Sequence, residues 1–229
     1  MPNERWHDLP PRLPFLRTVY GRPAIVDVRA AFFDVRRTVR LWMRTGRLGW
    51  QCEPQTRAKV WERLVVFWDV SGSMKTFLED YGQLWSRLAL THPRMGIFAV
   101  GTEMKDVTAT FRANQGGHLY EHLRRFKTLW EGGTNLGAVL TQWLDEYGDV
   151  WLRGSVAVLL VSDGWDRGSE VELETALVAL VRRRARLYWL NPWQDSLGFE
   201  PRTRALQVAQ PYLSGMASGL SVASLISLS

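Results

Sequence analysis

The sequence predicts an α/β fold, doubly wound, in which helices cover both faces of a mostly parallel central sheet. Near-continuous apolar runs at 63–69, 95–100 and 155–161 are typical of strands that are buried on both faces. Segments with a helical spacing of apolar residues separate these runs, at about 73–90, 135–147 and 168–184. Strands that alternate with helices in this way favour a parallel sheet over an antiparallel one.

The remaining elements follow the same alternation. A short edge strand is expected near 104–110 and a further strand at 186–190, and helical spacing is seen at about 117–128, 203–213 and, weakly, 221–228. These segments complete a domain that we expect to span residues 60–229.

Residues 1–59 are expected to form an N-terminal arm and an amphipathic helix packed on the domain. The first 25 residues are rich in Pro and Arg, which is typical of an extended arm. From 27 to 44 apolar residues recur at helical spacing, while Arg36 and Arg40 share a different face. That basic face is either solvated or a ridge that contacts a partner.

Composition points to a folded protein of the cytoplasm. Hydrophobic residues make up 46% of the 229 residues and charged residues 23%. The single Cys52 excludes an intramolecular disulfide, and the first residues lack the apolar core of a signal peptide. The net charge of +6 comes mainly from arginine. Without a nucleic-acid motif, this charge favours a solvated surface or an acidic protein partner over nucleic acid.

The most informative motif is Asp69-Val70-Ser71-Gly72-Ser73, which directly follows the first apolar strand. One carboxylate and two hydroxyls at alternate positions of a loop can converge on one point, and Gly72 lets the backbone turn tightly. Hard oxygen ligands of this kind suit Mg²⁺. A Ser/Asp-rich turn that only caps a helix at Ser73 is the structural alternative.

Two later segments strengthen the metal interpretation. Thr134 offers a third hydroxyl in a glycine-rich loop at a helix start, and Asp163 follows the apolar strand 155–161. In an open doubly wound sheet, ligands bind beyond the carboxyl ends of the strands, where the strand order reverses. If the strands 63–69 and 155–161 are neighbours at that point, Asp69 and Asp163 end side by side.

Together the three segments resemble the metal-ion-dependent adhesion site of the von Willebrand factor A domain. The resemblance implies that Ser71, Ser73 and Thr134 bind Mg²⁺ or Mn²⁺ directly, while Asp69 and Asp163 bind the ion directly, act through water or hydrogen-bond the hydroxyls. It implies no catalysis. The ion would instead accept a Glu or Asp carboxylate from another protein at an open coordination position.

The run Ser162-Asp163-Gly164-Trp165-Asp166-Arg167-Gly168 is similar to a signature of the CoxE-like group of these proteins. This similarity implies a partnership with a MoxR-type AAA+ ATPase in the maturation or remodelling of a client protein. Trp165, Asp166 and Arg167 form either a turn with a tryptophan lid or a partner contact. The identities of the client and of the ATPase do not follow from the sequence.

Two other classes of function compete with this adaptor. His118, Glu121 and His122 spell the His-x-x-Glu-His pattern of inverted zinc peptidases, which needs a third ligand and a substrate cleft. In the adaptor interpretation they lie on a short surface helix. A metal-dependent adhesion module is the third class, and the lack of a signal peptide disfavours it.

Overall fold

The computed structural model describes residue 6 and residues 17–19, 58–60, 63–113 and 133–228. The chain divides into two compact units, one formed by Met1–Leu16 with Trp61–Ser229 and the other by Arg17–Val60. In the second unit, β1 (Arg17–Val19) pairs antiparallel with β2 (Ala58–Val60). The expected boundary between residues 1–59 and 60–229 remains a prediction.

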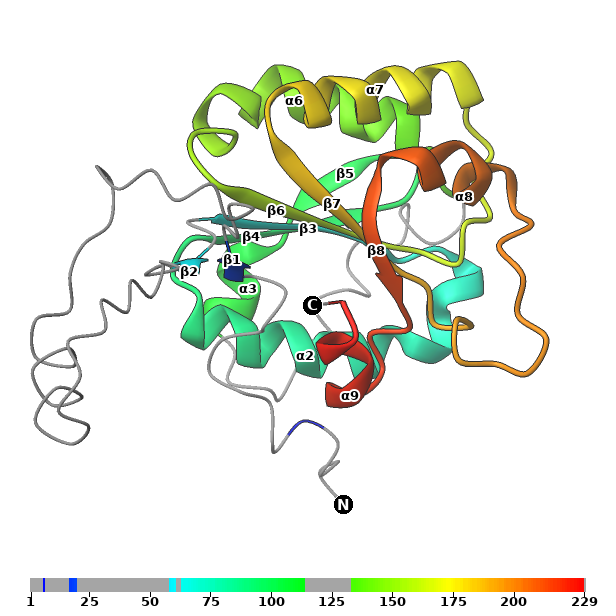
Figure 1. The fold of residues 1–229 in the computed structure, drawn as a ribbon, viewed down its shortest axis with the longest axis horizontal. Coiled ribbons are helices and arrows are strands. Elements are labelled where there is room, and N and C mark those ends of the chain that lie inside the picture. Colours follow the sequence, from blue (N-terminus) through cyan, green and yellow to red (C-terminus); the bar gives the residue numbers. More distant parts are fainter. Residues whose placement is uncertain (1–5, 7–16, 20–57, 61–62, 114–132, 229) are drawn as a thin grey trace, which may run out of the picture. The chain divides into compact units, whose positions relative to one another are not determined.

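The first unit contains a six-stranded sheet in the order β5-β4-β3-β6-β7-β8 (Figure 1). All neighbouring strands run parallel except β4 and β5, which are antiparallel. The strands are β3 (Arg63–Asp69), β4 (Met95–Val100), β5 (Met104–Asp106), β6 (Val156–Val161), β7 (Ala185–Leu190) and β8 (Leu213–Ala217). The predicted mostly parallel sheet is therefore confirmed, and the strand order reverses between β3 and β6.

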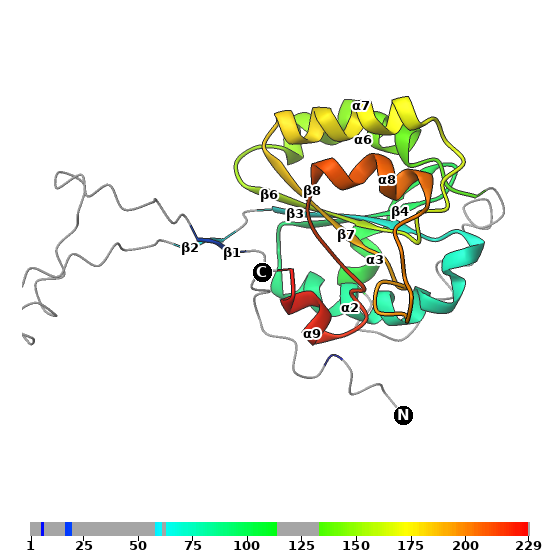
Figure 2. The same ribbon diagram turned by 45° about the vertical axis from the view of Figure 1, so that its right-hand side comes forward.

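Helices cover both faces of this sheet, as predicted. Figures 1 and 2 show α6 (Leu136–Trp151), α7 (Glu170–Arg182) and α8 (Arg204–Ala209) on one face. The other face carries α2 (Leu78–Thr91), α3 (Thr108–Ala113) and α9 (Val222–Ile226). Short 3₁₀ helices precede α2 (η3, Gly72–Phe77) and follow α8 (η4, Gln210–Tyr212).

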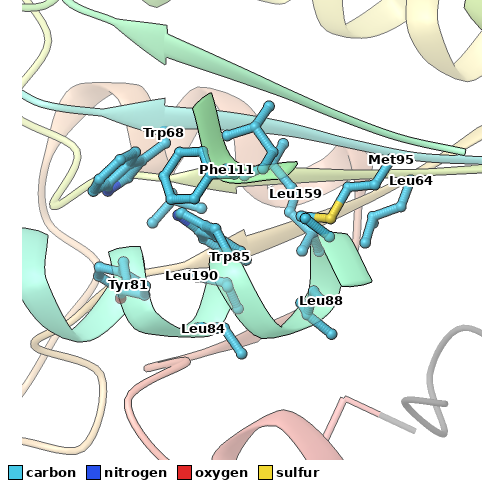
Figure 3. Packing of buried hydrophobic residues seen from close by; sticks show 14 of the residues in the cluster. Leu64, Trp68, Tyr81, Leu84, Trp85, Leu88, Met95, Phe111, Leu159 and Leu190 are labelled. Carbon is cyan, nitrogen blue, oxygen red and sulfur yellow. The ribbon is translucent and has the colours of Figure 1, made fainter. Parts of the chain in front are cut away.

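The core has two halves because the side chains of β3 alternate across the sheet. Leu64, Val66 and Trp68 pack toward the face that carries α2 and α3, and the ring centroid of Trp68 lies 5.8 Å from that of Phe111 in α3 (Figure 3). Val65 and Phe67 pack toward α6. All five side chains are at most 2% exposed, so β3 is fixed from both faces and its carboxyl end holds Asp69 rigidly.

Three elements differ from the predictions. The edge strand near 104–110 ends at Asp106, because the Asp106 carboxylate accepts a hydrogen bond from the Thr108 amide and α3 begins there. The helix expected from 73 starts as the 3₁₀ helix η3. The strand β8 was missed, since its sequence Leu-Ser-Gly-Met-Ala offers no apolar run, and the helical spacing at 203–213 extends into it.

Several predicted features lie outside the described residues, namely the early helix at 27–44 with Arg36 and Arg40, and the helix at 117–128. Within the expected N-terminal arm, Trp6 is fully buried in the core half that contains α2. Its carbonyl oxygen accepts a hydrogen bond from the Arg87 guanidinium at 2.5 Å. None of the helices in the described part of the chain is long and apolar enough to cross a membrane.

Candidate metal centre

Asp69 is the hub of a hydrogen-bond network at the carboxyl edge of the sheet. Its side chain is fully buried, at the end of the central strand β3. One carboxylate oxygen, Oδ1, accepts hydrogen bonds from the Ser71 amide at 2.9 Å and from the Thr134 hydroxyl at 3.0 Å. The other, Oδ2, accepts from the Ser162 hydroxyl at 2.6 Å. A single carboxylate thus ties together the three loops that the sequence singles out.

Ser71 and Ser73 lie on the loop that leaves β3. Ser71 is 4% exposed, Ser73 is exposed, and their hydroxyl oxygens are 3.2 Å apart. The two hydroxyls therefore face one another, as the Asp-x-Ser-x-Ser pattern predicts. Ser73 stands on the solvent side and Ser71 on the protein side.

The second loop is held by backbone contacts on both sides of Thr134. Gly133 adopts a φ of +81°, and the Asn135 amide donates to the Gly101 carbonyl at 3.0 Å. The Thr134 carbonyl accepts from the Arg167 amide at 2.9 Å, and Thr134 forms a parallel bridge with Asp166. These contacts leave Thr134 only 1% exposed, with its hydroxyl directed at Asp69.

Asp163 lies on the loop after β6, the strand next to β3. It is 4% exposed, and its Oδ1 accepts a hydrogen bond from the Trp165 amide at 3.1 Å. Its carbonyl accepts from the Asn191 side-chain amide at 3.2 Å. The turn requires Gly164, whose φ is +86° and whose Cβ, if present, would lie 2.3 Å from the Thr203 hydroxyl.

Ser162 lies at the site but was not among the predicted metal ligands. Its hydroxyl donates to Asp69 and accepts from the Gly164 amide at 3.0 Å, so it joins the first and third loops. The register of the sheet pairs Trp68 with Val161, which places Asp69 beside Ser162. The signal was present in the sequence, because Ser162 occupies the first position after a strand that neighbours β3.

Burial dominates the electrostatics of Asp69. Desolvation raises the pKa of this carboxyl to about 6, and the negative charge of Asp163 adds to the rise. Hydrogen bonds from Ser162 and Ser71 oppose it. Two carboxylates in so small a volume favour a cation nearby, since a cation would offset their repulsion.

The donor set fits a hard divalent ion. Metal–oxygen distances of about 2.1 Å in an octahedron place neighbouring ligand oxygens about 3.0 Å apart. The Ser71–Ser73 hydroxyl separation is 3.2 Å and that between Thr134 and Asp69 is 3.0 Å. Within the described residues no three His, Cys, Asp or Glu side chains group closely enough to hold a metal ion, so an ion here needs hydroxyl ligands.

The three residues after Gly164 differ in their surroundings. Trp165 is 72% exposed, whereas Asp166 is half-buried and its carboxylate accepts a hydrogen bond from the Leu136 amide at 3.0 Å, at the start of α6. Burial raises the pKa of Asp166, and amides of Leu136, Gly168 and Arg167 partly offset this rise. Asp166 thus connects the third loop to the helix that follows the second, and Arg167 is exposed.

The competing zinc motif of His118, Glu121 and His122 lies outside the described residues. Arg36 and Arg40 do as well.

The fold and the site place the chain in the class of von Willebrand factor A domains. A family model described as "VWA domain containing CoxE-like protein" matches residues 15–225, and the chain belongs to this family. The resemblance that the motifs indicated is therefore confirmed. Among curated proteins, none matches the sequence.

Several solved structures are similar in fold. One is an aerotolerance-related membrane protein from Bacteroides fragilis, with 14% identity, 67% of this chain and 89% of that chain covered, and a TM-score of 0.47. Another is a von Willebrand factor type A protein from Catenulispora acidiphila, with 16% identity, 74% and 41% covered, and a TM-score of 0.47. The manganese-loaded TRAP protein of Plasmodium vivax has 17% identity, 67% and 75% covered, and a TM-score of 0.44.

Proposed function

We propose that this chain is a non-catalytic protein-interaction adaptor whose docking point is a bound Mg²⁺ or Mn²⁺. The observation that carries the proposal is the Asp69 carboxylate, which hydrogen-bonds to all three loops of the candidate metal centre. This network aligns oxygen ligands through the chain's own hydrogen bonds. A preorganised site of neutral hydroxyls is suited to binding an ion and to leaving that ion electrophilic.

The residues proposed to hold the ion are Ser71, Ser73 and Thr134, with Asp69 and Asp163 acting directly or through water. When bound, the ion supplies a Lewis acid that accepts one carboxylate oxygen from a partner. The chain's own residues fix the hydroxyls, and burial of Ser71 and Thr134 limits access by water. Exposure of Ser73 leaves the site open toward solvent on one side.

The proposed partner is a MoxR-type AAA+ ATPase, and the proposed task is the maturation or remodelling of a client enzyme in the cytoplasm. Membership of the CoxE-like family supports this assignment. The sequence contains no Gly-x-x-x-x-Gly-Lys-Ser/Thr phosphate-binding motif of its own, so the nucleotide chemistry would belong to the partner. Arg36, Arg40 and Arg167 are proposed to steer an acidic partner toward the ion.

The test is capture of partners from the native organism on the immobilised full chain, with Mg²⁺ and again with EDTA. The ATPase is expected in the Mg²⁺ eluate and not in the EDTA eluate, and Thr134→Ala is expected to lose it. Thr141→Ala is the matched control, because Thr141 is exposed on α6 and its hydroxyl bonds only within that helix, to the Gly137 carbonyl. Capture that is equal with and without metal would refute the docking mechanism.

Activity assays on the purified chain complete the test. Neither ATP hydrolysis nor peptide hydrolysis is expected. Zinc bound in equimolar amount after purification without a metal-affinity tag, together with peptidase activity lost in His122→Ala, would replace the adaptor with the zinc hydrolase.

A further inference from the structure

Two exposed tryptophans, Trp165 and Trp193, lie on the loops that follow β6 and β7. We propose that they form an apolar recognition surface beside the metal, and that the partner segment is an acidic residue flanked by apolar side chains. This inference rests on the proposed function, since the acidic residue is the one that binds the ion. The inference adds that apolar contacts with the two tryptophans select among acidic partners.

The position of Trp165 is fixed by the metal loop itself. Its amide donates to the Asp163 carboxylate at 3.1 Å, two residues after that site residue. Its side chain is nevertheless 72% exposed. The backbone is thus anchored at the candidate metal centre while the indole ring stays in solvent.

Trp193 is linked to the same residue through Asn191. The Asn191 side chain donates to the Asp163 carbonyl at 3.2 Å and accepts from the Trp193 amide at 2.9 Å. The Trp193 ring packs edge-on against Phe77, with centroids 5.1 Å apart and an interplanar angle of 89°. Phe77 is the last residue of η3, the helix that begins beside Ser73. Trp193 therefore contacts the helix that continues the first loop and is bonded, through Asn191, to the third loop.

These two side chains are unusual within this chain. The other described tryptophans are fully buried or half-buried, and five of them, Trp6, Trp68, Trp85, Trp143 and Trp189, are 0% exposed. Trp165 and Trp193 are 72% and 49% exposed, and both lie at the carboxyl edge of the sheet. Packing against Phe77 accounts for only part of the Trp193 ring, and most of the Trp165 side chain stays exposed, whereas exposed indoles beside a binding site are typical of recognition surfaces.

Charge complementarity identifies the occupant as an acidic protein segment. Lys75 is exposed on η3, two residues beyond Ser73, and Arg167 is exposed on the third loop, with its amide bonded to the Thr134 carbonyl. The first and third loops of the candidate metal centre, which supply Ser73 and the anchored Trp165, therefore each carry or adjoin an exposed cation. A short segment with one carboxylate between two aliphatic side chains matches all three features. Its carboxylate would bind the ion and be attracted by the cations, and its aliphatic side chains would pack on the indoles.

The test uses three tripeptides, capped at both ends, titrated against the full chain with saturating Mn²⁺. Their sequences are Leu-Asp-Leu, Ser-Asp-Ser and Leu-Asn-Leu. Burial of leucine on the indoles is expected to make Leu-Asp-Leu bind about tenfold more tightly than Ser-Asp-Ser. Trp165→Ala and Trp193→Ala are each expected to remove most of that preference while leaving Mn²⁺ affinity unchanged. Leu90→Ala is the control, because Leu90 is an exposed leucine near the end of α2. This variant should keep the preference for Leu-Asp-Leu over Ser-Asp-Ser.

The outcomes separate the two proposals. Equal affinity for Leu-Asp-Leu and Ser-Asp-Ser, or a preference that survives in both tryptophan variants, overturns the aromatic surface and leaves metal docking standing. Binding of Leu-Asn-Leu as tight as that of Leu-Asp-Leu, or binding that persists in EDTA, overturns metal docking itself. The comparison of the two aspartate peptides on the unmodified chain needs no variant, so a misfolded variant cannot obscure it.

Discussion

The candidate metal centre has a buried half and an exposed half, and they are built differently. Asp69, Ser162 and Thr134 are at most 1% exposed and are joined by hydrogen bonds of 2.6 and 3.0 Å. Ser73 and Trp165 are exposed, and their contacts to the site are limited to one hydroxyl and one backbone amide. The buried half is fixed by the fold, whereas the exposed half is free to meet a partner.

Under the proposed function, this difference predicts that ion binding and partner selection are separable. Changes in the buried half should alter the ion and the stability of the fold together, because the same hydrogen bonds serve both. Changes at the exposed tryptophans should alter only the partner. The following predictions test that separation, from the largest expected effect to the smallest.

Loss of the Asp69 carboxylate is expected to have the largest effect. Asp69→Ala removes the acceptor that aligns Ser71 and Thr134, and Mg²⁺ affinity should fall by at least about a hundredfold, a few kcal/mol. Isothermal titration calorimetry measures this directly. Asp145→Ala, which removes an exposed carboxylate on α6, is the control. An unchanged Mg²⁺ affinity in Asp69→Ala would show that the Asp69 carboxylate holds the loops together without contributing to ion binding.

Crowding of the third loop should cost stability. Gly164→Ala combines a φ of +86° with a Cβ that would lie 2.3 Å from the Thr203 hydroxyl. We expect a loss of about 2–4 kcal/mol in the free energy of unfolding, measured by chemical denaturation. Gly198→Ala is a matched control, because its φ is +75° but nothing lies within 4 Å of the added Cβ. It should cost only about 1 kcal/mol. Equal losses would mean that backbone strain, and not crowding, dominates.

The charge of Asp69 should destabilise the fold when no metal is bound. Its pKa of about 6 in the folded chain exceeds the ordinary value of 3.8, so the folded state holds a proton that the unfolded state releases between these pH values. The contribution of this group to stability is therefore complete below pH 3.8 and is lost as the pH rises toward 6. In EDTA at pH 7, Asp69→Asn should be more stable than the unmodified chain by on the order of 1–3 kcal/mol.

Thermal denaturation across this range of pH provides the control for the charge effect. The advantage of Asp69→Asn should vanish near pH 4, where both side chains are neutral. Added Mg²⁺ should stabilise the unmodified chain and not the variant. A variant that is less stable than the unmodified chain at pH 7 in EDTA would indicate that hydrogen-bond geometry outweighs desolvation at this residue.

The smallest effect is expected at the exposed half. Trp165→Ala should leave Mg²⁺ affinity and unfolding free energy nearly unchanged, within about 0.5 kcal/mol, because the side chain is 72% exposed and its amide is retained. Calorimetry and denaturation measure the two quantities. A large loss of Mg²⁺ affinity would show that the exposed half also shapes the ion site, and the proposed separation would fail.

Much of this arrangement could be predicted from the sequence. The strands β3, β4 and β6 were clear because each is a run of apolar residues buried on both faces, and the side-by-side placement of Asp69 and Asp163 followed from the topology. The hydroxyls of Ser71 and Ser73, at alternate positions, predicted the first loop of the candidate metal centre. The family resemblance then supplied the roles of Thr134 and Asp163, which spacing alone could not assign.

The parts that could not be predicted depend on tertiary contacts. Strand β8 has only two strongly apolar residues, Leu213 and Met216, and forms because the edge of β7 offers partners for its backbone. Ser162 looked like part of a turn until the register of β3 and β6 placed it against Asp69. Trp193 lies 28 residues after Trp165 in the chain, and the hydrogen bonds of Asn191 link it to Asp163.

The pairing of β1 with β2 has a consequence for how the chain can change in length. Arg17 pairs with Val60, so the two ends of the 17–60 unit lie within about 5.5 Å of each other, as in any antiparallel pair. In the sequence, Trp6 precedes this unit and β3 follows it, and both belong to the core of the first unit. In the sequence, the 17–60 unit is thus an insertion into the first unit, and its two ends meet where β1 pairs with β2. Residues between the paired strands could be lengthened, shortened or exchanged for another module at little entropic cost to the core.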